Sequence, residues 1–522
     1  MPGPVPVAET FDGGSESGVS LKERTLQGIT WSFITRILGQ LVQYGVSIVL
    51  ARILFPADFG LVGMVSVFTG FAAIFIDFGI GSAIVQRTDI DDRQLRAAFG
   101  ATVVVGAVTT LLVAAAAPLI AAVYHRDELV ALTRVSAAGF LLSSIGVVPR
   151  AMLMRGMQIK RLMLLDLAVF VASSACSVVL AVAGAGVWTV VVSALVTAVG
   201  QTLLPILFGP WRVGFDADMR HIRPLMTMSL NLLGFNIINY WSRNIDNLLI
   251  GRMLGETSLG LYARAYALML LPITQITTVL ASSMLPMLSR VHDDRARSKN
   301  LFLRALGMIA LVGFPMMLGL ASVADPFVRA LYGPKWLGLI PLLRVLAVVG
   351  ALQMLTNPTG WLFVSQGRTD LILRWGLGAC SAIIVALLIG ASFGSALSVA
   401  VAYLVINVIL FAPCLWLAGT TVAASLGDIF KVIAAPALCA IVMAAVVAGV
   451  DWVLPAVVPE LLRLASEVAV GAAVYGLIVY GAKLESLSEL MRHVRDRLQS
   501  RRQAHQPATA AGIPVTEGQR LV

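Results

Sequence analysis

The stretch VSIVLARILFPADFGL, residues 46–61, returns two hundred positions later as DNLLIGRMLGETSLGL, residues 246–261. The positions that stay identical without a gap are Arg52/Arg252, Leu54/Leu254, Gly60/Gly260 and Leu61/Leu261. A second pair of similar segments follows in the same order, PLIAAVY at 118–124 and PFVRALY at 326–332. Two matching segments in one order indicate that the chain arose by internal duplication.

The composition is that of a polytopic membrane protein. Of the 522 residues, 58% are hydrophobic and only 13% are charged, whereas about 25% are charged in ordinary globular domains. The net charge of +10 lies in loops and in the C-terminal tail, so it does not indicate a nucleic-acid partner. The four cysteines lie in apolar segments without metal-ligand spacing, which indicates neither a disulfide framework nor a metal site. No cofactor is expected.

Apolar runs of roughly 20 residues predict about fourteen membrane helices. We place them near 26–51, 59–85, 97–122, 129–149, 162–183, 186–208, 222–250, 259–287, 301–322, 338–363, 371–391, 394–417, 430–449 and 463–482. With this threading, 27 of the 38 Lys and Arg residues lie on the side of the two termini and nine on the opposite side. Because cytoplasmic loops are enriched in cations, both termini are predicted to be cytoplasmic.

Six predicted helices separate the two copies of the repeat, so both copies enter the membrane from the same side. The repeats are therefore expected to be parallel, related by an axis along the membrane normal. The predicted fold is all-α, with two parallel six-helix lobes and two extra C-terminal helices. Its parts are a disordered cytoplasmic tail at 1–21, an N-lobe at 22–215, a C-lobe at 216–420, helices 13 and 14 at 421–483, and a basic amphipathic helix with a disordered tail at 484–522.

Polar side chains form a stripe on the first helix of each predicted lobe. The first copy carries Arg36, Gln40, Gln43 and Ser47 on one helical face, and the second copy carries Asn236, Tyr240, Arg243 and Asn247 at the corresponding positions. Lipid cannot satisfy such side chains, so the stripes are predicted to line a water-filled cavity.

The charged residues near these stripes have alternative interpretations. Arg36, roughly 15 Å deep in its helix, either forms a structural ion pair or binds an anion in the cavity, and Arg243 could be neutralised by Asp246. The predicted outer-gate residues either contact phosphate or snorkel to headgroups; they are Arg52, Arg252 and Arg264. The candidates for ion coupling, with pairing to nearby cations as the alternative, are Asp77, Asp166 and Asp246.

Signatures of enzymes are missing from the sequence. All five histidines fall in predicted loops or tails, and neither HExxH nor GxxxxGK[ST] occurs, which argues against an intramembrane metalloprotease and against a self-contained ATPase. A membrane glycosyltransferase or glycan polymerase is a further alternative. Such enzymes usually need sizeable outer loops, and the predicted outer loops are short. The chain is therefore not expected to be an enzyme.

Four segments resemble one family of transporters. They are VLARILFPADFGLVGMV at 49–65, FIDFGIGSAIVQR at 75–87, PRAMLMRGMQIKRL at 149–162 and LYGPKWLGLIPLLRVLA at 331–347. Together they resemble the polysaccharide exporters of the multidrug/oligosaccharidyl-lipid/polysaccharide superfamily, especially the Wzx-type group that includes the colanic acid exporters. The resemblance covers about residues 21–419, roughly three quarters of the chain.

The resemblance implies a flippase of the bacterial plasma membrane that moves a polyprenyl-diphosphate-linked oligosaccharide by alternating access, driven by an ion gradient or the membrane potential. It implies that Arg36 and Arg243 meet the diphosphate or acidic sugars and that Arg52 and Arg252 act at the outward gate. The residues expected to bind sugar hydroxyls are Gln40, Gln43, Asn236, Asn239, Tyr240 and Asn247. The implied partners are the lipid-linked oligosaccharide, membrane lipids, and the polysaccharide polymerase and chain-length machinery.

A cation-coupled multidrug exporter of the same superfamily is the main rival prediction. Such a protein binds small amphipathic cations, and positive side chains in its cavity would repel them. Arg36 and Arg243 in the predicted cavity therefore favour an anionic substrate.

Overall fold

The structure is a computed structural model that describes residues 39–40, 42–77, 80–87, 90–209, 211, 214, 229–455 and 457–482. Every regular element in these ranges is a helix, and twelve helices are long and apolar enough to cross a membrane. The all-α membrane class is thus confirmed. The first predicted span falls mostly outside the described residues, as do the start of the seventh and the amphipathic helix after residue 484, so the count of fourteen stays a prediction.

The chain divides into two compact units, Met1–Gly260 and Leu261–Val522. The N-terminal unit contains the short helix Val42–Ile53, α2 (Pro56–Asp77), α3 (Ile80–Gln86), α4 (Asp92–Tyr124), α5 (Glu128–Arg155), α6 (Ile159–Val182), α7 (Trp188–Phe208) and the first part of α9 (Ser229–Arg290). The C-terminal unit contains the rest of α9, α10 (Arg295–Ser322), α11 (Ala324–Phe327), η2 (Val328–Tyr332), η3 (Pro334–Trp336), α12 (Leu339–Ser365), α13 (Thr369–Ser392), α14 (Ala396–Val422), α15 (Leu426–Val453) and α16 (Glu460–Gly481). The predicted lobe boundary at residue 215 lies outside the described residues and stays a prediction.

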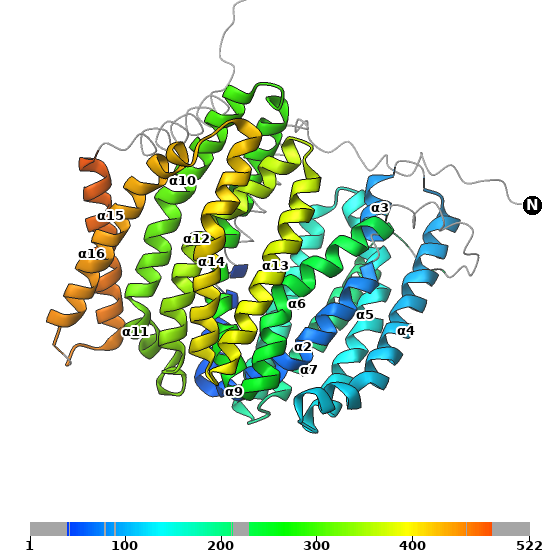
Figure 1. Ribbon diagram of the computed structural model, residues 1–522. Coiled ribbons are helices and arrows are strands. Elements are labelled where there is room, and N and C mark those ends of the chain that lie inside the picture. Colours follow the sequence, from blue (N-terminus) through cyan, green and yellow to red (C-terminus); the bar gives the residue numbers. More distant parts are fainter. Residues whose placement is uncertain are drawn as a thin grey trace, which may run out of the picture. The chain divides into compact units, whose positions relative to one another are not determined.

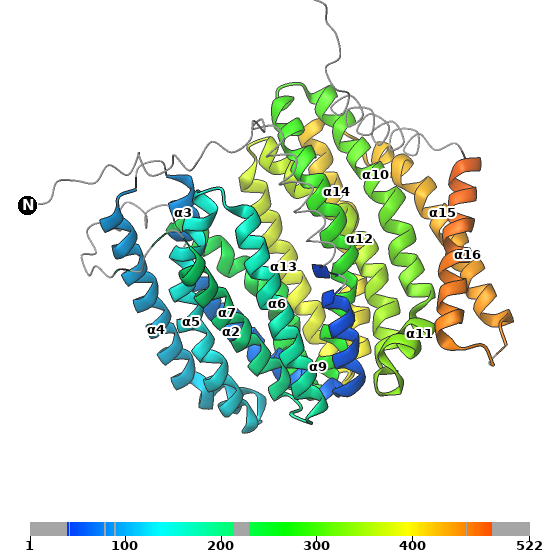
Figure 2. The same ribbon diagram turned by 180° about the vertical axis from the view of Figure 1, so that it is seen from behind.

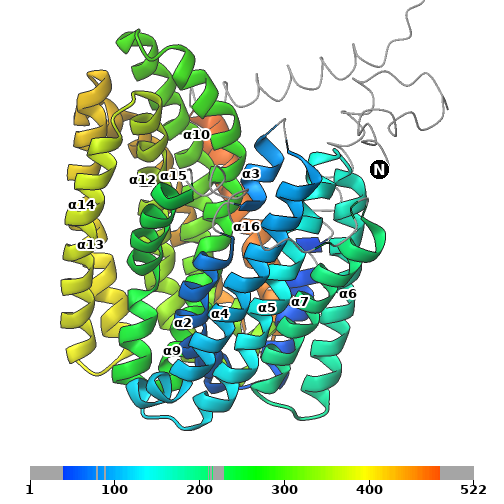
Figure 3. The same cartoon turned by 90° about the vertical axis from the view of Figure 1, so that its right-hand side faces the viewer.

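In the N-terminal unit the long helices form a row. The helix α4 packs on α5, α5 on α7 and α7 on α6, while α2 lies against α4 and α5 (Figure 3). Small residues bring these helices close together, as helix packing in membranes requires. A Cβ on Gly106 would overlap the hydroxyl of Ser144, and one on Gly146 would lie 3.0 Å from the hydroxyl oxygen of Thr202.

The C-terminal unit repeats this row. Here α10 packs on α12, α12 on α14 and α14 on α13 (Figure 1). The helix α4 ends in the PLIAAVY segment, and α10 leads into the PFVRALY segment, so the helices that correspond in sequence also pack in the same order. The two extra helices follow: α15 packs along α10, and α16 along α15 (Figure 2). The repeated order supports an internal duplication.

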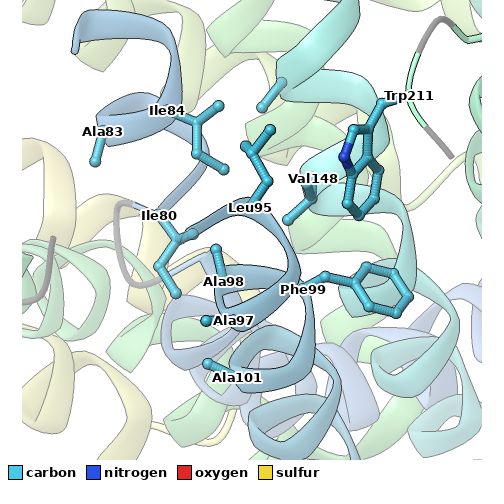
Figure 4. Close-up of a cluster of buried hydrophobic side chains, with 11 residues drawn as sticks. Ile80, Ala83, Ile84, Leu95, Ala97, Ala98, Phe99, Ala101, Val148 and Trp211 are labelled. Atoms are coloured by element: carbon cyan, nitrogen blue, oxygen red, sulfur yellow. The ribbon is translucent and has the colours of Figure 1, made fainter. Parts of the chain in front are cut away.

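One end of the N-terminal unit is closed by a cluster of apolar side chains around the start of α4. Asp91 caps this helix with a full capping box, in which its side chain accepts from Gln94 N at 2.7 Å. The indole of Trp211 donates to Asp92 at 3.1 Å and packs on Phe99 (Figure 4). This cluster packs α3 against α4 and α5.

Both copies of the repeat change direction at the same place. In the first copy the helix Val42–Ile53 ends and α2 begins at Pro56, with Phe55 between them. In the second copy the corresponding residue is Gly255, which has φ 81° and ψ −179° and breaks α9 into two helices. That conformation suits glycine alone among common residues. Each copy is therefore a helical hairpin.

Candidate functional site

The two hairpins meet in the N-terminal unit through a pair of glycines. A Cβ built on Gly60 would overlap the carbonyl oxygen of Glu256, and a Cβ on Gly260 would overlap that of Pro56 and lie 3.0 Å from Gly60 N. Both glycines and both partners are related by the repeat offset of two hundred residues. The two halves of the contact are therefore equivalent, and exchanging the two repeat copies turns one half into the other. Only glycine lets backbones approach so closely.

The end of α4 holds the turn of the second hairpin by polar contacts. The guanidinium of Arg126 lies 2.8 Å from the carboxylate of Glu256, and Arg252 lies 2.6 Å from Nδ1 of His125. His125 is the left-handed C-cap of α4, with φ 57°. The Arg126 side chain is half exposed, and such exposed pairs contribute only about 0–1 kcal/mol. These contacts add specificity to the hairpin contact while leaving it easy to open.

A phenol joins α9 to α2 deeper in the same unit. The Tyr240 hydroxyl donates to the carbonyl oxygens of Val67 at 2.7 Å and of Ser66 at 3.1 Å, and a Cβ on Gly70 would lie 2.5 Å from the same hydroxyl. The ring lies 6.0 Å from that of Phe71. In this conformation Tyr240 therefore ties the two helices together, and its predicted role as a sugar ligand stays a prediction.

We expect Tyr240→Phe to lower the unfolding free energy by about 1 kcal/mol, because it removes the bond to the α2 carbonyls and keeps the ring packing. The measurement is thermal unfolding of the purified protein in detergent. Tyr480→Phe is the matched control, since the Tyr480 side chain is 75% exposed near the end of α16. Equal melting temperatures for both variants would contradict the role of the Tyr240 hydroxyl.

The structure places the remaining stripe residues on their two predicted helices, as far as they are described. Gln43 and Arg243 are exposed. The half-buried members are Gln40, Ser47 and Asn247. Arg36 lies outside the described residues, and so do the side chains of Asn236 and Asn239. Their predicted contacts with substrate stay predictions.

Asp246 is a buried acid on α9, next to the second stripe. Its side chain is 5% exposed, and its Oδ1 accepts from the backbone N–H of Asn247 at 2.8 Å. Asp166 lies on α6 and forms a two-pronged ion pair with Arg150, at 2.6 and 3.0 Å. The pairing that the sequence offered as the alternative is thus present for Asp166. The side chain of Asp77 lies outside the described residues, and the ion-coupling roles stay predictions.

The predicted gate arginines have different surroundings. Arg52 is exposed at the end of the helix Val42–Ile53, and Arg252 contacts His125. In the C-terminal unit Arg264 donates to the Tyr332 hydroxyl at 3.2 Å and lies 5.3 Å from the centre of that ring. Arg264 is therefore engaged within its own unit, while Arg252 lies in the polar cluster beside the glycine contact.

Sequence reasoning did not assign a role to the glycines of the hairpin or to Arg126 and Glu256. Gly60 and Gly260 were visible as identical positions of the repeat, and a small residue kept at a helix start is a signal for close packing. The Arg126–Glu256 pair joins residues far apart in sequence, and no local pattern reveals it.

The sequence of the chain matches a family of polysaccharide biosynthesis proteins. A family described as "Polysaccharide biosynthesis protein" matches residues 49–341, more than half of the chain. The chain belongs to this family. A fellow polysaccharide biosynthesis protein, "Teichuronic acid biosynthesis protein TuaB" of Bacillus subtilis (strain 168), is 30% identical over 91% of this chain and 99% of its own length. "Lipopolysaccharide biosynthesis protein WzxC" of Escherichia coli (strain K12) is 28% identical over 75% of this chain and 80% of its own length.

Two solved structures of transporters share the fold of this polysaccharide biosynthesis protein. "Lipid II flippase MurJ, inward closed conformation" aligns with a TM-score of 0.69 at 13% identity, over 87% of this chain and 98% of that one. An inward-facing "multidrug resistance MATE family transporter of the MOP superfamily" aligns with a TM-score of 0.59 at 18% identity, over 76% of this chain and 99% of that one. The protein therefore has the fold of this exporter superfamily, as its sequence motifs predicted.

Proposed function

We propose that this protein is a flippase that moves a polyprenyl-diphosphate-linked oligosaccharide across the bacterial plasma membrane by alternating access. The observation that carries the mechanism is the self-matching contact of Gly60 with Glu256 and of Gly260 with Pro56. This contact supports a gate between the two hairpins, because equivalent residues of the two repeat copies meet there. Membership of a polysaccharide biosynthesis family supports the substrate class.

The contact has the properties that a reversible gate needs. Backbone groups meet across the two glycines, and the buried side chain of Leu259 packs on Gly63 beside them. Parting the hairpins therefore separates closely packed surfaces, which can return to the same arrangement. The surrounding ion pair of Arg126 and Glu256 is partly exposed and therefore contributes little to closure. In the proposed cycle the hairpins part on the outer side to release the sugar head and meet again when the cavity faces the cytoplasm.

The chemistry of the proposed cavity suits an anionic, hydroxyl-rich head group. Arg243 is exposed on α9, and an arginine cannot deprotonate and matches phosphate with two parallel N–H bonds. The amide and hydroxyl side chains of Gln43, Ser47 and Asn247 can exchange hydrogen bonds with sugars as readily as with water. The prenyl chain would remain in the bilayer, so only the polar head would need to cross.

The proposal is tested with the purified protein in liposomes. A polyprenyl-diphosphate oligosaccharide with an oxidisable sugar is placed in both leaflets, and an impermeant oxidant reports how fast inner-leaflet molecules become accessible. We expect faster exposure than in empty liposomes. Transport of small amphipathic cations with no effect on the lipid-linked sugar would contradict the proposal and favour the multidrug exporter.

A further inference from the structure

The helices α15 and α16, which follow the duplicated part, hold a buried acid that the cavity does not use. Glu467 lies on α16, its side chain is 0% exposed, and neither carboxylate oxygen has a hydrogen-bond partner among the described residues. A carboxylate buried in this way costs several kcal/mol if it stays charged and unpaired. Intramembrane acids of this kind mark functional sites by default.

The cation nearest to Glu467 is already engaged elsewhere. Arg463 lies 3.6 Å from Glu467, but its Nε donates to Asp451 Oδ1 at 2.7 Å and its second nitrogen to the Asp451 carbonyl at 2.5 Å. One guanidinium thus faces two carboxylates, and its short bonds all go to Asp451. The single positive charge of Arg463 neutralises the two acids fully only when one of them is protonated. The acid without hydrogen bonds, Glu467, is the one that gains from neutrality.

The other elements packed against α16 supply no further free cation near this acid. In α11 and η2 the charged residues are Asp325 and Arg329, which pair with each other at 2.7 Å. Residues 305–322 of α10 carry no charged side chain. The other charged residues of α15, Asp428 and Lys431, lie in its first two turns, at the opposite end of that helix from Asp451. Glu460, two turns before Glu467 on α16, is an acid itself. The charge of Glu467 is therefore decided at the cluster of Asp451, Arg463 and Glu467.

The cluster lies near the loop that joins α15 to α16, where water is expected to reach it. The side chains of Asp451 and Arg463 are 31% and 19% exposed, and Glu467 lies one turn further along α16. One turn further still comes Gly471, and then Tyr475, whose hydroxyl donates to the Leu311 carbonyl of α10 at 2.7 Å. A change of charge at Glu467 thus occurs on the face of α16 that also binds α10.

We propose that Glu467 is the proton-binding site through which a proton gradient drives this transporter. The Glu467 carboxylate takes up one proton from the aqueous phase next to Asp451 and becomes a neutral carboxylic acid, and loss of that proton restores the carboxylate beside Arg463. The change alters how α16 packs against α15 and α10. The coupling part of this inference rests on the proposed transport function, whereas the proton site itself does not.

Two measurements test the inference separately. Infrared spectra of the protein in lipid nanodiscs, recorded over a range of pH, should show the carbonyl band of a protonated carboxylic acid that Glu467→Gln removes. Glu128→Gln, at an exposed position that begins α5, is the control and should keep the band. Asp451→Asn frees Arg463 for Glu467, so it should shift the band to lower pH. A band unchanged by Glu467→Gln would overturn the proton site.

Coupling is measured in liposomes with an imposed pH gradient and the labelled lipid-linked oligosaccharide. The gradient should raise the flipping rate of the unmodified protein. Glu467→Gln should lose this increase completely, while Glu128→Gln should keep it. A full response in Glu467→Gln would overturn the coupling role. Failure of the unmodified protein to move the lipid would instead refute the proposed function, and the infrared band would still decide the proton site.

Discussion

Gly60→Val is expected to reduce export of the lipid-linked oligosaccharide strongly while leaving the protein folded in the membrane. The first carbon of the new side chain would overlap the carbonyl oxygen of Glu256, and a backbone atom cannot rotate away. Overpacking of a close contact typically costs about 1–3 kcal/mol, which would lower the ratio of closed to open protein by about 5-fold to 150-fold. Gly260→Val is expected to have the same effect, because Gly260 makes the equivalent contact with Pro56.

The matched control for both valines is Gly376→Val on α13, where an added Cβ would have nothing within 4 Å. Export is followed in cells as surface polysaccharide and in liposomes as flipping rate, with the protein level checked by immunoblot. Normal export by Gly60→Val and Gly260→Val would show that the hairpins do not need to meet. Loss of protein from the membrane would point instead to a role in folding, which the liposome assay with purified variants separates.

Arg243→Ala is expected to reduce export about tenfold or more, because a hydrogen bond to a charged group typically contributes about 1.5–3 kcal/mol. The reduction should appear in substrate affinity, and Arg243→Lys should restore part of it, since lysine keeps the charge and loses the two-pronged geometry. The measurement is flipping rate against the concentration of lipid-linked oligosaccharide. With a neutral lipid-linked analogue that lacks the diphosphate, Arg243→Ala and the unmodified protein should have the same flipping rate.

Arg297→Ala provides the control for a lost surface charge. Arg297 is 76% exposed and pairs with Asp294 one turn away, an interaction of little energetic consequence. Unchanged affinity in Arg243→Ala, with Arg297→Ala behaving identically, would remove Arg243 from the proposed site.

Much of the fold was predictable from the sequence because membrane insertion imposes simple rules. Long apolar runs predicted the helices, and the structure has twelve such spans among its described residues. The predicted spans left breaks at 52–58 and at 251–258, and the helix breaks at Phe55 and Gly255 lie inside them at corresponding positions of the repeat. The same duplication explains the packing order shared by α4, α5, α7 and α6 with α10, α12, α14 and α13.

The contacts of the site were much less predictable. Helical periodicity places Tyr240 and Arg243 on one stripe, but it does not tell that the Tyr240 hydroxyl binds the α2 backbone. Tertiary packing of residues far apart in sequence creates the Arg126–Glu256 contact. The turn between α15 and α16 creates the contacts of Arg463 with Asp451 and Glu467. In a hydropathy profile Glu467 looks like an ordinary charged residue near a helix end. Only the structure shows that its side chain is fully buried.

The most direct test of alternating access measures whether the two hairpins separate. Phe55 and Met253 are 57% and 48% exposed at the hairpin ends, so spin labels on cysteines at these two positions can report the distance between them after the four natural cysteines are replaced. In lipid nanodiscs we predict a short-distance population for the closed hairpins and a second, longer one that grows when the lipid-linked oligosaccharide is added. A single short distance that never changes while the same labelled protein transports substrate would contradict this prediction.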